Sequence, residues 1–161
     1  MNKTQKLCAL ALTVSAAMLL SFIESQLPSF AVVPGIKIGL ANIAVVFALY
    51  RVGGKAAFAV SCVRVFLISQ LFGSLVGMIY GLVGAALSLT VMIILKKYSP
   101  LSPVGVSVAG GVAHNIGQIA VACVLVGSTA LLYYLPVLVI SGTVAGVVIG
   151  VASGNLVKRL K

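Results

Sequence analysis

Six apolar runs separated by short connectors make up most of this 161-residue chain. A run of about 17–25 apolar residues is long enough to cross a bilayer as an α-helix. Only 7% of the residues are charged, whereas a soluble domain carries about 25%. The sequence therefore predicts an all-α integral membrane protein, a bundle of six transmembrane helices that forms a single domain over residues 1–161. We expect the spans near residues 7–23, 36–50, 56–72, 75–95, 104–127 and 133–156.

The positions of the basic residues predict how this bundle is oriented. Nine of the eleven Lys and Arg residues lie before the first predicted span or after the second, fourth and sixth. With six spans all nine fall on one side, and because basic connectors remain in the cytoplasm, both termini are expected there. The net charge of +10 thus indicates membrane orientation and not nucleic-acid binding, which needs a continuous basic patch. The nine residues are Lys3, Lys6, Arg51, Lys55, Lys96, Lys97, Lys158, Arg159 and Lys161.

The first apolar run, within MNKTQKLCALALTVSAAMLLSF, has the lysines and the apolar stretch of a signal peptide. No obvious small-x-small cleavage site follows it, so we expect a retained first span, with removal as the alternative. The next connector, ESQLPSFAVVPG (24–35), contains two prolines and a glycine. Because proline interrupts a helix, we expect this connector to be a structured turn or lid.

Small residues recur at four-residue intervals in three of the predicted spans. Such a stripe lets two helix backbones approach closely and make van der Waals contact. We favour packing within the bundle, and docking against another membrane subunit is the alternative. The stripes are Gly73, Gly77, Gly81 and Ala85; Gly105, Ala109, Ala113 and Gly117; and Gly142, Gly146, Gly150 and Gly154.

Several polar side chains lie deep inside the predicted spans. Arg64 is roughly 13–15 Å from the cytoplasmic end of its span at 1.5 Å per residue, and a charge at mid-membrane costs about 2.5–3.5 kcal/mol. His114, at a similar depth, shares a helix face with Gln118, whereas Asn115 points about 100° away. The mouth of the expected pocket is formed by Lys37 and residues 24–35. The candidate substrate-binding residues are Lys37, Asn42, Arg64, His114, Asn115 and Gln118.

Two interpretations of these polar residues remain open, a ligand site and a structural network that fixes the helix register. Lys37 and Arg64 are cations outside the cytoplasmic clusters, and Glu24 is the only acidic residue of the chain. At least one of the two cations therefore depends on neutral groups, on water or on an anionic ligand. This shortage of carboxylates favours a ligand with a phosphate or carboxylate group.

The residues needed for enzyme chemistry are scarce. The chain has no pair of carboxylates for acid–base catalysis and no nucleotide-binding motif. Its one His and the widely separated Cys8, Cys62 and Cys123 do not have metal-ligand spacing. We expect the cysteines to be small buried hydrophobes, and we expect neither catalytic residues nor a metal or cofactor.

Four segments carry a resemblance to a known family: PGIKIGLANI (34–43), CVRVFLISQLFGS (62–74), GGVAHNIGQI (110–119) and YLPVLVISGTVAG (134–146). They resemble the Gx transporter family, also labelled heptaprenyl diphosphate synthase component I. That family is similar to the substrate-binding S components of energy-coupling-factor (ECF) transporters, which are six-helix proteins that partner with a transmembrane T component and two ATPases. The resemblance implies a multi-pass protein of the bacterial cytoplasmic membrane. It also implies a vitamin-like or isoprenoid-related ligand beneath the 24–35 connector.

The chain departs from both family labels. Prenyl synthases hold Mg²⁺-diphosphate with aspartate-rich motifs, and this chain contains no aspartate. S components often carry Ala-x-x-x-Ala on the first helix for docking, where this chain has Ala9, Thr13 and Ala17. The alternatives are therefore a non-catalytic membrane subunit that serves prenyl diphosphate, quinone or flavin-linked redox chemistry, and a purely structural bundle.

The predicted topology is testable by cysteine labelling of intact cells, in a variant whose three native cysteines are replaced by alanine. A membrane-impermeant thiol reagent should react with a cysteine introduced at Ser29. It should not react with cysteines introduced at Asn2, Gly53, Ser99 or Leu160. Labelling from outside at Ser99 would contradict the six-span topology.

Overall fold

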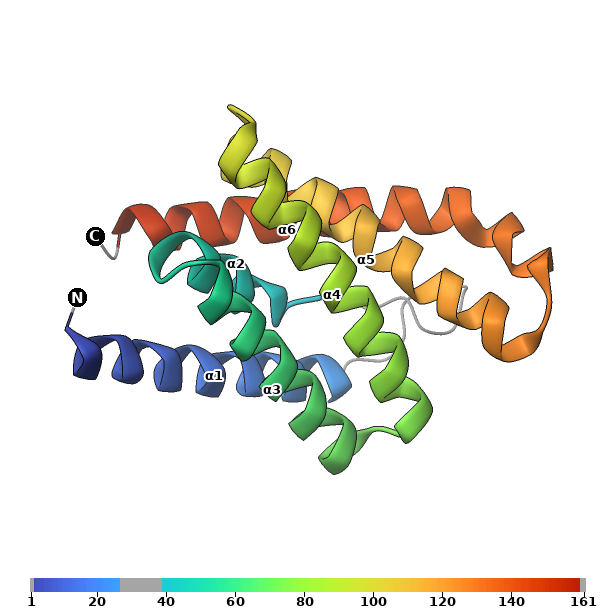
Figure 1. Cartoon of the computed structure of the whole chain (residues 1–161), viewed down its shortest axis with the longest axis horizontal. Coiled ribbons are helices and arrows are strands. Elements are labelled where there is room, and N and C mark those ends of the chain that lie inside the picture. Colours follow the sequence, from blue (N-terminus) through green and yellow to red (C-terminus); the bar gives the residue numbers. More distant parts are fainter. Residues whose placement is uncertain (1, 27–38, 160–161) are drawn as a thin grey trace.

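A computed structural model describes residues 2–26 and 39–159, and the regular structure in this part of the chain is entirely helical (Figure 1). Five helical segments are long and apolar enough to cross a membrane, and the last of them, Thr129–Arg159, comprises a short 3₁₀ helix and the α-helix that follows it. The elements are α1 (Lys3–Gln26), α2 (Asn42–Arg51), α3 (Gly54–Phe72), α4 (Leu75–Tyr98), α5 (Pro103–Val126), the short 3₁₀ helix η1 (Thr129–Tyr134) and α6 (Leu135–Arg159).

The second predicted span, near 36–50, was the shortest expected from the sequence, and the helix there is shorter still. Helix α2 has 10 residues, so it rises about 15 Å, half of the roughly 30 Å hydrocarbon core. Gly39 has a φ of 78°, a left-handed conformation that an α-helix cannot continue through. Residues 36–38 lie outside the described residues. The structure therefore supports five long apolar helices and one short one, and the count of six complete spans stays a prediction.

Helix α2 lies inside the bundle, in contact with α1, α3 and α6. Its side chains Val45, Val46, Ala48 and Leu49 are buried in the core. At its C-terminal end the Lys96 ammonium donates a hydrogen bond of 2.6 Å to the Leu49 carbonyl oxygen. A basic group there also complements the negative end of the helix dipole. Neighbouring helices, and not lipid, thus surround most of this short element.

Helix α5 packs against both α4 and α6, and these are the most extensive interfaces of the bundle. Both ends of the chain lie at the same end of the molecule (Figure 1). Many large apolar side chains remain exposed along the outer helix faces, as expected where lipid covers them. Cys8 is also exposed, so its predicted burial is wrong: its side chain points outward from α1.

The glycine stripe of α6 is a close helix contact within the chain, as predicted. A Cβ added at Gly146 would lie 2.5 Å from Val108 Cα, and one added at Gly150 would lie 2.6 Å from Val104 Cα. The predictions of close contact for the other two stripes are only partly correct. In α4, an added Cβ at Gly77 would meet only the nearby Ser74 hydroxyl. In α5 the tight positions are Gly110, Gly111 and Gly117, and Gly105 meets only Leu101.

Small residues of α1 are also turned inward. Thr13 is 5% exposed and Ala17 is fully buried, and α1 packs against α2 and α3. The Thr13 hydroxyl donates a 2.6 Å hydrogen bond to the Ala9 carbonyl of its own helix. This face therefore serves the packing of the bundle.

Two alanine substitutions in the glycine stripe of α6 should differ in their effect on stability, because only one of the two positions is in close contact with the α5 backbone. Gly146→Ala should lower the free energy of unfolding by about 1–3 kcal/mol, because the new methyl group overlaps the α5 backbone. Gly154→Ala is the matched control, since an added Cβ there meets only Pro103 Cβ at 3.8 Å. Thermal unfolding of the detergent-purified protein measures both. Equal stability of the two variants would contradict the contact.

Candidate functional site

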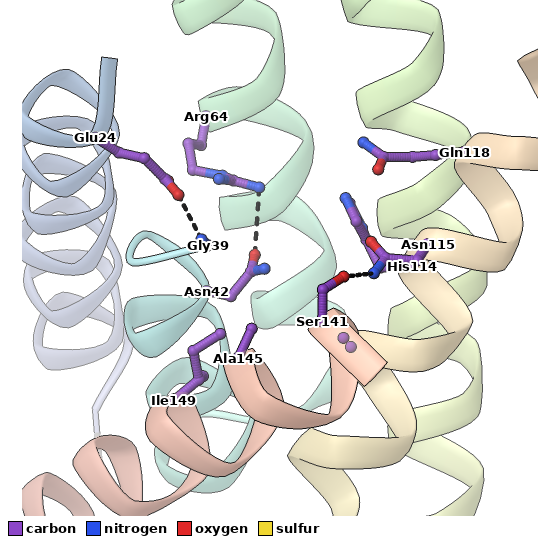
Figure 2. A pocket seen from close by; sticks show the side chains of 12 residues that line it. Glu24, Gly39, Asn42, Arg64, His114, Asn115, Gln118, Ser141, Ala145 and Ile149 are labelled. Carbon is purple, nitrogen blue, oxygen red and sulfur yellow. Dashed lines mark hydrogen bonds between the residues drawn. The ribbon is translucent and has the colours of Figure 1, made fainter. Parts of the chain in front are cut away.

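A polar cavity of about 90 Å³ lies between the helices. Its lining comes from the end of α1, the turn before α2, and helices α2, α3, α5 and α6 (Figure 2). Cavities of this kind hold water or a ligand when they offer several polar partners. The lining residues are Glu24, Gly39, Asn42, Arg64, Gly111, His114, Asn115, Gln118, Ser141, Gly142, Ala145 and Ile149.

Arg64 is the cation of this cavity, and it comes from the middle of α3. Its Nη2 donates a long hydrogen bond of 3.4 Å to Asn42 Oδ1 (Figure 2). Its Nε is buried and has no hydrogen-bond partner among the described residues. A guanidinium has five N–H donors, and a buried donor left without a partner costs about 1–3 kcal/mol. Arg64 thus has unused hydrogen-bonding capacity.

Glu24 is the carboxylate of the cavity, near the end of α1. Its Oε1 accepts a hydrogen bond from the Gly39 backbone N–H (Figure 2). The left-handed φ of Gly39 lets the chain turn there before entering α2, and any side chain would strain that conformation. Glu24 therefore joins the end of the first helix to the beginning of the second.

His114 and Gln118 lie on one face of α5, as their spacing predicted, and this face packs on α4 at Gly84. A Cβ added to Gly84 would lie 2.9 Å from His114 Cε1 and 3.1 Å from Gln118 Cγ. The same glycine lets the α5 backbone approach at Gly117, where an added Cβ would lie 3.0 Å from Gly84 Cα. The missing side chain of Gly84 therefore makes room for the imidazole at the cavity wall.

Asn115 faces α6 and not α4. Its Nδ2 donates to the Leu138 carbonyl at 2.7 Å and to Ser141 Oγ at 3.3 Å. The Ser141 hydroxyl in turn donates to the same carbonyl at 3.1 Å. Asn115 thus links α5 to α6 by hydrogen bonds. This is the structural role that remained open from the sequence. The same side chain also lines the cavity.

Five of the six predicted site residues come together in this cavity; Lys37 lies outside the described residues, as do residues 27–35 of the predicted mouth. Sequence reasoning placed Glu24 only at the start of the mouth, with no binding role, and did not include Ser141. The status of Glu24 as the only acidic residue was a usable signal, whereas Ser141 beside a glycine stripe carried none. The five residues are Asn42, Arg64, His114, Asn115 and Gln118.

Over residues 2–26 and 39–159, no three His, Cys, Asp or Glu side chains are close enough together to hold a metal ion. The chemistry that the cavity offers is hydrogen bonding and charge. The described lining residues supply one guanidinium, one carboxylate, three side-chain amides, an imidazole and a hydroxyl.

The sequence matches the family model described as heptaprenyl diphosphate synthase component I over residues 13–156. The chain belongs to this family. All the lining residues of the cavity fall inside the matched region. No curated protein and no solved structure matches the chain. The chain is thus a membrane protein of this family.

The bonds of Asn115 predict a stability effect. Asn115→Ala should lower the free energy of unfolding by about 0.5–1.5 kcal/mol, the net contribution of a typical hydrogen bond. In a Ser141→Ala background the loss should differ, since both side chains bond the Leu138 carbonyl and groups in one network do not act additively. Thermal unfolding of the parent chain, the two single variants and the double variant measures the coupling energy between Asn115 and Ser141. Strictly additive losses would show that Asn115 and Ser141 act independently.

Proposed function

We propose that this chain is the substrate-binding membrane subunit of an ECF-type transporter and resembles an S component. Its substrate is a small vitamin-like or isoprenoid-related molecule, anionic or amphipathic, and its location is the bacterial cytoplasmic membrane. The observation that carries this proposal is the buried Nε of Arg64, which has no partner among the described residues and belongs to a half-buried side chain that lines a polar cavity. An acidic group of a ligand would satisfy that donor.

The surroundings of Arg64 support ligand binding over packing alone. Ionisable groups inside a membrane protein are expensive, and they commonly mark substrate or ion pathways. Glu24 bonds the Gly39 N–H, and Asn42 supplies a single long bond to Arg64. A purely structural network would leave fewer buried donors without a partner.

This subunit would not power transport alone and would not be an enzyme. Its sequence has no nucleotide-binding motif and no aspartate for Mg²⁺-diphosphate chemistry, so the proposal requires a T component and ATPase subunits as partners. The small residues Thr13 and Ala17 of α1 are buried against the chain's own helices. The T component would therefore dock on a surface other than this small-residue face.

The family description favours a second candidate, a non-catalytic membrane subunit that serves prenyl diphosphate chemistry or membrane redox chemistry. Purification of the tagged protein from its native membrane in mild detergent separates the two. Recovery of a T component and ATPases supports the transporter subunit. Recovery of a prenyl synthase or of a redox enzyme supports the second candidate.

Ligand binding should depend on Arg64 and on His114. Mass spectrometry of molecules retained by the purified protein identifies the ligand, and calorimetric titration then measures its affinity. Arg64→Gln and His114→Ala should each weaken binding about ten- to a hundredfold, because a hydrogen bond to a charged group contributes about 1.5–3 kcal/mol.

Arg51→Gln is the matched control, since Arg51 is an exposed arginine at the end of α2. It should bind as tightly as the parent chain. If both cavity variants fold and also bind as tightly as the parent, the polar residues are a packing network and the proposed function is wrong.

A further inference from the structure

Two of the described lining residues of the cavity carry opposite charges. Glu24 reaches it from α1 and Arg64 from α3, and apart from His114 the other lining residues are uncharged. The expectation from sequence, a cation that attracts an anionic ligand, did not include a carboxylate in the same site. A simple anion at Arg64 would also be near Glu24, and the low dielectric of a membrane bundle strengthens that repulsion.

The two charged groups are tied to the same short turn of the chain. Glu24 accepts from the Gly39 N–H, and Arg64 donates to the Asn42 side chain. The Asn42 N–H closes the turn by donating to the Gly39 carbonyl at 2.8 Å. Figure 2 shows both charged side chains converging on this turn from neighbouring helices. Each charge is thus anchored to a neutral group, and the turn sets the spacing between them.

Both groups keep capacity for a further partner. The Arg64 Nε is buried without a partner among the described residues, and its other N–H groups make one bond, at 3.4 Å. Among the same residues the Glu24 carboxylate accepts one hydrogen bond, at Oε1, and a carboxylate has about four lone-pair sites. An acidic group can therefore bind Arg64 while an ammonium or N–H group binds Glu24.

We infer that the cavity selects a small zwitterion, or a molecule that carries an acidic group and a basic N–H group a short distance apart. The acidic group binds Arg64, and the basic group binds Glu24. The amides of Asn42 and Gln118 form hydrogen bonds with the uncharged polar atoms of the ligand. This inference rests on the proposed function and defines its substrate class: a pocket with balanced charges matches a ligand with balanced charges.

Matched pairs of small molecules test the inference on the full chain in detergent. The zwitterions are glycine, β-alanine and 4-aminobutanoate, and the corresponding acids without the amino group are acetate, propionate and butyrate. The zwitterion series also varies the distance between the two charges. Thermal stabilisation and calorimetric titration give the affinities. At least one zwitterion should bind ten or more times tighter than its acid.

Two variants test which residue binds the basic group of the ligand and which binds the acidic group. Glu24→Gln keeps an amide oxygen to accept from the Gly39 N–H, so the turn is retained; it should abolish the preference for the zwitterion and leave binding of the acid equal or tighter. Arg64→Gln should weaken binding of both series about ten- to a hundredfold. The comparison of zwitterion with acid in the parent chain needs no variant, and so it stands even if a variant fails to fold.

The outcomes separate this inference from the proposed function. Acids that bind the parent as tightly as their zwitterions, and bind Glu24→Gln more tightly still, overturn the inference but leave an anion-binding subunit. A molecule retained by the purified protein that lacks either an acidic or a basic group also overturns it. If neither series binds and no molecule is retained, the inference and the proposed function both fail.

Discussion

The guanidinium of Arg64 comes from the middle of an apolar helix, and its Nε is buried without a partner among the described residues. Its charge is expensive in that position, so neighbouring elements have to supply polar atoms at the same depth. Asn42 supplies one bond from the first turn of α2, and the remaining neighbours surround a cavity instead of filling it. The short α2, the turn at Gly39 and the polar face of α5 all meet at this charge.

The walls of the cavity are held by close helix contacts. Helix α5 approaches α4 where Gly117 meets Gly84, and it approaches α6 where an added Cβ at Gly111 would lie 2.4 Å from the Gly142 carbonyl oxygen. Backbones in such contact cannot separate without losing van der Waals packing. The polar residues between these contacts are therefore positioned before any ligand arrives, which reduces the entropic cost of binding.

Much of this arrangement could be predicted from the sequence, because depth in a membrane helix follows from counting residues. The helical class, the boundaries of the long helices and the shared depth of Arg64 and His114 follow in this way. The length of α2 could not be predicted, since its apolar run continues through Gly39 and only the backbone conformation interrupts it. The glycine contacts of α5 were predicted only at Gly117, and those of Gly110 and Gly111 were missed because small residues occupy several faces of this helix. The position of Glu24 in the cavity could not be predicted, because it depends on a turn that brings Gly39 beside the carboxylate. Residue spacing along the chain does not reveal such a turn.

The shortness of α2 has an electrostatic consequence. Peptide dipoles aligned along a helix place roughly half a positive elementary charge at its N-terminus. A full-length span would deliver that charge to the membrane surface, where water and salt screen it. Helix α2 begins at Asn42, beside the cavity, so its positive end adds to the field of Arg64 inside the bundle. The carboxylate of Glu24, bonded next to this helix end, opposes both contributions, so this single acidic side chain reduces the positive potential of the cavity.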